Sequence, residues 1–220
     1  MRISRLLLAP FALLLGCQAR EGEQVAVASS DDSLQSNPAL AKADLSRIQG
    51  NPNAKTWFVI VSDFQCPYCK QWHDSASAVI RREYVETGKI RVAYVHFPLG
   101  QHRHAVPTAE AAMCAGVEDK FWAYHDALFE TQARWQGLQD ATPILDSLAR
   151  VVGLNVAEHK MCRDKHVMLP LISADRERAD NAGAQSTPTF LVGGQVLKGV
   201  YPVRLLRQVL NTAIAADSAR

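Results

Sequence analysis

Two cysteines, Cys66 and Cys69, stand three residues apart, directly after an apolar run. Cysteine pairs at this spacing exchange disulfides, contribute half of a metal site or form a structural bond. If a helix begins at Pro67, Cys66 lies at its N-cap, where unpaired amides and the helix dipole stabilise a thiolate. Cys69 then lies one turn deeper, so we expect Cys66 to attack and Cys69 to resolve the mixed disulfide. Pro67 and Tyr68 lie between them and set how strongly the reduced form is stabilised.

The other interpretations of this pair have weaker support in the sequence. A zinc site commonly takes a second close pair of ligands, and neither Cys114 nor Cys162 has a close partner. His102 and His104 form a lone His-x-His in a polar loop, a pattern that is more often solvated or structural. In a copper-transfer site we expect a methionine before the first cysteine, where Gln65 stands. A structural ring this small would remove little chain entropy. We therefore expect no metal.

A second candidate element is Thr187-Pro188, which falls immediately before the apolar run Thr189 to Val192. Proline at the start of a strand is uncommon unless the strand is an edge or the bond is cis. A cis turn could lie against the sulfurs and offer the Thr187 backbone to a substrate peptide as a strand partner. The dipeptide is a weak signal alone and a strong one together with the cysteine pair.

The elements that must position the cysteines form a strand-helix-strand unit. Trp57 to Val61 is a continuous apolar run, typical of a strand buried on both faces. A helix is predicted from Pro67 to about Glu86, followed by a strand over Ile90 to Phe97. Two strands joined by a helix at this spacing imply a right-handed parallel unit.

The rest of the chain is predicted to contain an all-helical stretch, then a hairpin and a last helix. Apolar residues recur at helical spacing over residues 104–184. Gly193-Gly194 separates two short strand-like runs, which is a strong hairpin signal. A final helix is expected over Val203 to about Ala216. The predicted order is β-α-β, then helices, then β-β-α, an α/β fold with a helical insertion.

The N-terminus resembles an export signal. A short positive segment precedes the apolar run Leu6 to Leu15, which is too short to cross a bilayer. Leu14 to Cys17 resembles the bacterial lipobox, in which the cysteine is lipidated and tethers the protein to a membrane. We therefore expect a signal peptide over residues 1–16 and a lipid on Cys17. The alternative is ordinary cleavage after Ala19, which discards Cys17.

Composition indicates one globular domain behind a tether. The 220 residues are 48% apolar, which suffices for one core. Lys and Arg number 24 against 22 Asp and Glu, and removal of Arg2 and Arg5 would make the two counts equal. Charge therefore indicates neither nucleic acid nor an acidic membrane partner. Residues 17–50 are small and polar, so we expect a flexible tether, with one short helix possible over Asn37 to Ile48, and the folded domain over 51–216.

Three blocks of the sequence together resemble the DsbA family of thioredoxin-fold oxidoreductases, over roughly residues 50 to 215. The resemblance implies a thioredoxin core with a helical insertion, exported thiol–disulfide exchange and no cofactor beyond the cysteines. It implies that Cys66 is the nucleophile, Cys69 the resolving thiol and Pro188 a cis-proline preceded by Thr187. The blocks are NPNAKTWFVIVSDFQCPYCKQW, FPLGQHRHAVPTAEAAMCAGVEDKFWAYHDALF and GAQSTPTFLVGGQVLKG.

The four cysteines beyond Cys17 allow three pairings in an oxidising compartment. Some members of the family carry a second disulfide in the helical insertion, and Cys114 and Cys162 fall in matching helices. The resemblance therefore implies a structural disulfide between these two. The alternative is two buried, inert thiols.

One departure from the family concerns proton transfer. Many relatives have a buried glutamate six residues before the first cysteine, where this chain has Ile60. The acid nearest in sequence is Asp63, which is also common in the family. We expect His73, four residues after Cys69, to be a surface residue and not an acid–base partner. Three further residues are expected to pack or to line a cleft: His96, Trp72 and Trp122.

The function that the resemblance implies is an exported disulfide donor that acts on proteins with free thiols or disulfides. A membrane redox partner would recycle the pair, and the lipid would hold the protein in the cell envelope, on the periplasmic or extracytoplasmic side. The alternatives are a reductase or isomerase on the same fold, or a non-catalytic module that binds unfolded peptide. Known isomerases of this kind dimerise through an added N-terminal domain, for which the tether is too short and polar, so we expect a monomer.

Overall fold

A computed structural model describes residues 37–219, which fold around a five-stranded sheet with the strand order β1-β3-β2-β4-β5. The central strands β2 (Thr56–Ser62) and β3 (Ile90–His96) are parallel. Strands β4 (Thr189–Val192) and β5 (Gln195–Lys198) extend the sheet antiparallel on the other side of β2. The predicted order of elements is therefore present in the described part of the chain.

Side-chain alternation along β2 divides the core into two layers. Phe58 and Ile60 belong to the main core, on the face that the helix after β2 covers. Val61 belongs to a smaller cluster on the opposite face, together with Ala179 and Ala184. Because both faces are covered, β2 carries the continuous apolar run seen in the sequence.

The helix that follows β2 begins at Pro67, as predicted, because proline supplies a suitable φ and lacks only an amide that the first turn does not use. It contains two π-helical stretches, which the sequence did not indicate. It is followed by a turn in which Gly88 has a φ of 71°. Its successive parts are α3 (Pro67–Trp72), η1 (His73–Ser77), α4 (Ala78–Ile80) and η2 (Arg81–Val85).

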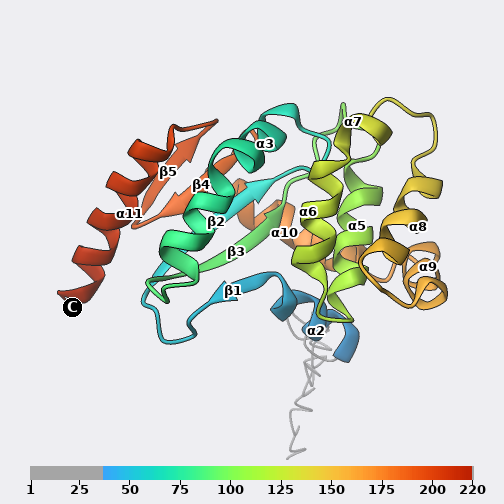
Figure 1. Cartoon of the computed structure of the whole chain (residues 1–220), viewed down its shortest axis with the longest axis horizontal. Coiled ribbons are helices and arrows are strands. Elements are labelled where there is room, and N and C mark those ends of the chain that lie inside the picture. The colour runs from blue at the N-terminus through green and yellow to red at the C-terminus, as the bar shows by residue number, and fades with distance from the viewer. Residues whose placement is uncertain (1–36, 220) are drawn as a thin grey trace, which may run out of the picture.

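The predicted helical insertion consists of six helices. Five of them form a bundle beside the sheet, on the right in Figure 1, with Tyr124, Leu128 and Trp135 fully buried inside it. The sixth helix contributes Ala179 to the smaller core cluster and contacts β3. The helices are α5 (Ala105–Gly116), α6 (Phe121–Glu130), α7 (Gln132–Trp135), α8 (Thr142–Val151), α9 (Val156–Asp164) and α10 (Leu169–Asn181).

The C-terminal part is a hairpin and a helix at the other side of the sheet (Figure 1). Gly193 and Gly194 have φ angles of 54° and 77°, the left-handed pair that a two-residue hairpin turn requires. Helix α11 (Val203–Ser218) buries Leu206, Leu210 and Ala213 along one stripe. Among the described helices, none is both long and apolar enough to span a bilayer.

The expected boundary between tether and domain at residue 51 is wrong for the described part of the tether. Residues 37–50 contain helix α2 (Pro38–Ser46), which begins at the Asn37 N-cap, and strand β1 (Ile48–Gly50). Strand β1 pairs antiparallel with β3, and α2 buries Leu40 and Ala43 against the helical bundle. The segment folds because β3 has a free edge and α5 an apolar face to cover. The predicted signal peptide and Cys17 lie outside the described residues.

Candidate active site

Cys66 lies at the N-cap of α3, where the sequence predicts it. Its thiol donates a hydrogen bond to the Thr187 carbonyl oxygen, with 3.4 Å between the two atoms. The Thr187-Pro188 peptide bond is cis. The structure therefore brings together the cysteine pair and the proline turn, although 121 residues separate Cys66 and Thr187 in the chain.

The surroundings of Cys66 favour its thiolate. A hydrogen bond from the Cys69 thiol is the largest cause that lowers the pKa of Cys66, to about 6. Burial opposes this shift, while the Thr187 hydroxyl and the backbone amides of Cys69 and Tyr68 add to it. These amides belong to the first turn of the helix, which has no other acceptors for them. At neutral pH the Cys66 sulfur is therefore mostly an anion.

Cys69 has the opposite character. Its side chain is fully buried, and burial raises its pKa well above the ordinary value. The neighbouring Cys66, through its hydrogen bond and its charge, raises the pKa of Cys69 further, whereas the Ser62 hydroxyl and the Asp63 backbone lower it. Both cysteines are free thiols. One sulfur is thus prepared as a nucleophile and the other as a protonated partner beside it.

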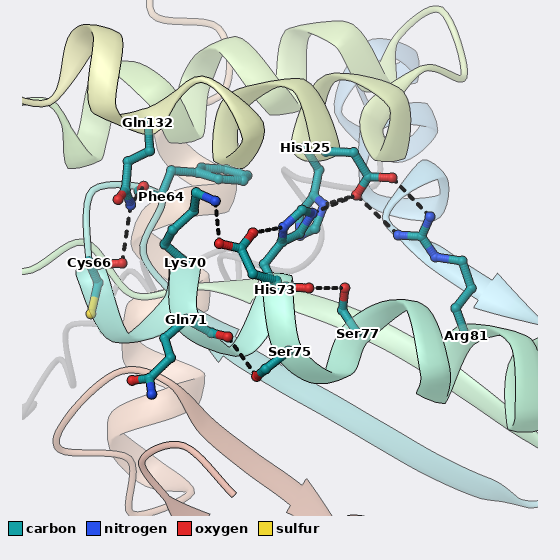
Figure 2. A network of polar contacts seen from close by, with 12 residues as sticks. Phe64, Cys66, Lys70, Gln71, His73, Ser75, Ser77, Arg81, His125 and Gln132 are labelled. Carbon is teal, nitrogen blue, oxygen red and sulfur yellow. Dashed lines mark hydrogen bonds and ion pairs between the residues drawn. The ribbon is translucent and has the colours of Figure 1, made fainter. Parts of the chain in front are cut away.

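Gln132 and Gln65 hold the loop in front of the cysteines, and sequence reasoning missed both. The Gln132 side-chain amide, on α7, donates to the carbonyl oxygens of Phe64 (2.7 Å) and Cys66 (3.2 Å). Figure 2 shows the contact with Cys66. The Gln65 amide donates to the Gln136 carbonyl. No local pattern marks these glutamines, because their partners are backbone groups distant in sequence.

Asp63 anchors the same loop from inside. Its carboxylate is fully buried and accepts from the backbone amides of Gln65 (2.8 Å) and Leu99 (3.0 Å). A ring nitrogen of His102 lies 2.7 Å from Asp63 Oδ2, the oxygen that also accepts from Leu99. His104 contacts the Leu138 carbonyl. The two histidines of the His-x-His motif therefore point to different partners.

His73 is not the surface residue that we expected. Its side chain is only 11% exposed and stacks on Phe129 of α6, 5.0 Å between ring centroids. Its ring nitrogens lie 3.2 Å from Asp74 and 3.4 Å from Asp126. Figure 2 shows this polar network along the helix, in which Arg81 also reaches the α6 carboxylate. The network joins the cysteine-bearing helix to the insertion.

His73, His125 and Asp126 are the described residues whose ligand atoms could hold a metal ion, since these atoms lie within 4.8 Å of one another. Arg81, however, donates to both Asp126 oxygens, at 2.9 and 3.1 Å. Burial would raise the pKa of Asp126, but hydrogen bonds from His125, His73 and Arg81 hold it well below its usual range. The Arg81 guanidinium already balances the charge of this carboxylate. A metal cation would therefore be repelled unless it displaced Arg81.

The remaining predicted residues lie where packing requires them. Trp72 and His96 are buried, and Trp122 contacts the main core. Cys114 of α5 and Cys162 of α9 are joined in a disulfide, the pairing that the resemblance implies, with 5.9 Å between their Cα atoms. They belong to the insertion and are not part of the site.

Comparison with known proteins gives the family. A family model described as Thioredoxin matches residues 42–211. The chain belongs to the thioredoxin family. The match begins inside α2, in agreement with the folded segment found before residue 51.

This thioredoxin-family protein covers very different shares of two curated relatives. It is 32% identical over 181 residues to Na(+)/H(+) antiporter NhaA 1 of Salinispora arenicola, covering 80% of this chain and 26% of that protein. The chain therefore spans about a quarter of that relative. It is 24% identical over 150 residues to the probable disulfide bond formation protein D of Bacillus cereus, covering 67% of this chain and 69% of that protein.

Solved structures identify the fold more closely. This thioredoxin-family protein superposes on alpha-DsbA1 of Wolbachia pipientis with a TM-score of 0.70 at 21% identity, covering 79% of this chain and 92% of that one. The predicted thioredoxin fold with a helical insertion is therefore confirmed.

Proposed function

We propose that this protein is a thiol–disulfide oxidoreductase in which Cys66 is the nucleophile and Cys69 the resolving thiol. The observation that carries this proposal is the divided chemistry of the pair, a thiolate-favouring sulfur at the helix N-terminus and a buried, protonated one beside it. The names of relatives such as the Bacillus cereus protein agree with this activity. No cofactor beyond the cysteines is needed for the exchange.

Substrate peptides would bind across the turn that contains Pro188. The Thr187 carbonyl lies beside the Cys66 sulfur, so it is in position to pair with the backbone of an extended chain whose cysteine approaches Cys66. Tyr68 is 62% exposed next to the pair and offers an apolar surface to the same chain. Because backbone pairing does not depend on the side chains of the substrate, this mode of recognition would allow many different unfolded proteins to bind.

The favoured direction is disulfide donation. A thiolate at Cys66 stabilises the reduced form, and this stabilisation makes the disulfide a stronger oxidant. We propose further that the protein acts as a monomer outside the cytoplasm, anchored by a lipid on Cys17, and that a membrane redox partner reoxidises it. The lipobox-like stretch before Cys17 and its export-signal context support this location.

The decisive experiment measures the reduction potential of the Cys66–Cys69 pair together with oxidative refolding of a reduced substrate protein. We expect an oxidising potential, loss of refolding activity in Cys66→Ser and accumulation of a mixed disulfide in Cys69→Ser. A strongly reducing potential would instead favour the reductase or isomerase. Full activity in Cys66→Ser would favour a peptide-binding module without turnover.

A further inference from the structure

The buried thiol of Cys69 lies over hydroxyl groups. Side chains alternate along β2, so Ser62 points to the same face of the sheet as Ile60. Tyr94, which is the register partner of Ile60 on β3, points to this face as well. Cys69 and Ile60 belong to the same core cluster, which places the sulfur over this face. Ser62, Tyr94 and Cys69 are each at most 2% exposed.

Electrostatic interactions connect the Ser62 hydroxyl to the Cys69 sulfur and to Tyr94. The Ser62 hydroxyl interacts with both Cys69 and Tyr94 and favours the ionised form of each, against the effect of burial on both pKa values. Although Ser62 acts on it electrostatically, the Tyr94 hydroxyl makes no hydrogen bond in the described part of the chain. A buried donor without an acceptor is costly and needs an explanation, and a redox role is one of those known.

We propose that the Ser62 hydroxyl donates a hydrogen bond to the Cys69 sulfur whenever this sulfur is a thiolate, with Tyr94 as a positioning residue behind it. This role rests on the proposed function and deepens it. When Ser62 turns its proton toward the sulfur, its oxygen accepts from the Tyr94 hydroxyl, which then gains a partner. Charge-assisted hydrogen bonds in a dry interior are strong, and two in series reinforce each other.

Ile60 explains why such a donor is needed. At the position where the resemblance implies a buried glutamate, this chain has an apolar side chain that is 3% exposed. A carboxylate could take the Cys69 proton, but a serine hydroxyl cannot, because its own acidity and basicity are too weak at neutral pH. Ser62 therefore stabilises the anion, and water takes and returns the proton.

A thiolate forms at Cys69 in both directions of exchange. When a substrate thiolate attacks the oxidised pair, a bond forms between the substrate sulfur and Cys66, the Cys66–Cys69 bond breaks, and its electron pair leaves on Cys69. In the reverse direction Cys69 loses its proton to water, attacks Cys66 and expels the substrate sulfur as a thiolate. The oxidant in this step is the mixed disulfide, which forms when Cys66 attacks a substrate disulfide and whose substrate sulfur leaves reduced.

A two-step thiol assay separates the roles of the cysteines. The reduced protein is mixed with dithiobis(nitrobenzoate), which releases one coloured thiolate when Cys66 attacks and a second when Cys69 resolves the mixed disulfide. In Ser62→Ala at pH 7 we expect an unchanged first step and a second step slowed about fivefold, because the smaller thiolate population is partly offset by the greater nucleophilicity of a less stabilised anion. Tyr94→Phe should slow the second step about twofold.

Matched controls exist on the helix that carries Cys69. Ser77→Ala removes a buried hydroxyl that donates to the His73 carbonyl, and Tyr84→Phe removes one that contacts Asn211. Neither should change the second step, and Ser62→Thr should restore it because it keeps the hydroxyl. An unchanged second step in Ser62→Ala, or equal slowing of both steps, would overturn the role of Ser62. If the unmodified protein released no second coloured thiolate, the proposed function itself would fail.

Discussion

The two cysteine pairs of this protein occupy opposite settings. Cys66 and Cys69 are free thiols at the start of a helix, whereas Cys114 and Cys162 are bonded between α5 and α9. Cys114 lies near the C-terminal end of α5, where the helix dipole disfavours a thiolate. The comparison shows that a helix N-terminus favours charge on Cys66, that burial opposes it on Cys69, and that the pair near the C-terminal ends of its helices serves as a link.

The largest expected contrast lies within the first pair itself. At pH 7 we expect iodoacetamide to alkylate Cys66 at least about a hundredfold faster than Cys69, because thiolate population follows the two pKa shifts. The Cys66 rate should rise as pH increases through about 6 and level off above it. Peptide mapping after timed quenching measures both sites. Equal labelling of the two cysteines would remove the distinction on which the comparison depends.

The second pair should matter for stability and not for exchange. Replacing Cys114 and Cys162 together with alanine should lower the free energy of unfolding by about 4 kcal/mol, since the bond closes a separation of 48 residues. Urea denaturation of the oxidised protein measures this loss. Disulfide exchange by the variant should stay within about twofold of the parent. A large loss of exchange with intact folding would contradict the separation of roles.

Helix α6, which packs against the helix of the first pair, should also make the protein sensitive to acid. Burial lowers the pKa of His125 to about 4, below the unfolded value near 6.5. The stabilisation from the neutral ring is therefore complete above pH 6.5 and is lost as pH falls toward 4, by up to about 3 kcal/mol.

Chemical denaturation at a series of pH values measures this dependence. His125→Asn should reduce it, whereas Gln208→Asn, at an exposed position of α11, is a control that removes no titratable group. The same slope in His125→Asn as in the parent would show that other groups cause the acid sensitivity.

The smallest expected effect concerns the loop before Cys66. Gln132→Ala removes the donor to the Phe64 and Cys66 carbonyls and should cost about 1–2 kcal/mol of stability. Exchange activity should fall as well, because the loop is held less firmly. Gln208→Ala on the exposed side of α11 is the matched control and should change neither quantity. An effect no larger than that of the control would show that the loop does not need Gln132.

The unit that carries the chemistry was predictable because its residues act locally. The apolar run of β2, the proline after Cys66 and the Gly193-Gly194 turn each determine their own conformation. Strand β1 was not predictable, because Ile-Gln-Gly has no alternating pattern and becomes a strand only by pairing with β3.

The supporting residues of the site were missed for a different reason. The position of His73 four residues after Cys69 predicts an exposed side chain, but helix α6 covers it with Phe129 and Asp126. Gln132 has no recognisable motif, since it binds carbonyl groups 68 and 66 residues away. Such long-range contacts depend on how the insertion docks, which a single sequence does not encode in local patterns.

The placement of α2 has a consequence for orientation. Figure 1 shows α2 at one edge of the molecule and the start of α3 at the opposite edge. A chain that enters the fold at Pro38 therefore does so on the side away from the sulfurs. If the residues before it lead to a membrane anchor, as proposed, this point of entry would leave the sulfurs accessible to unfolded chains.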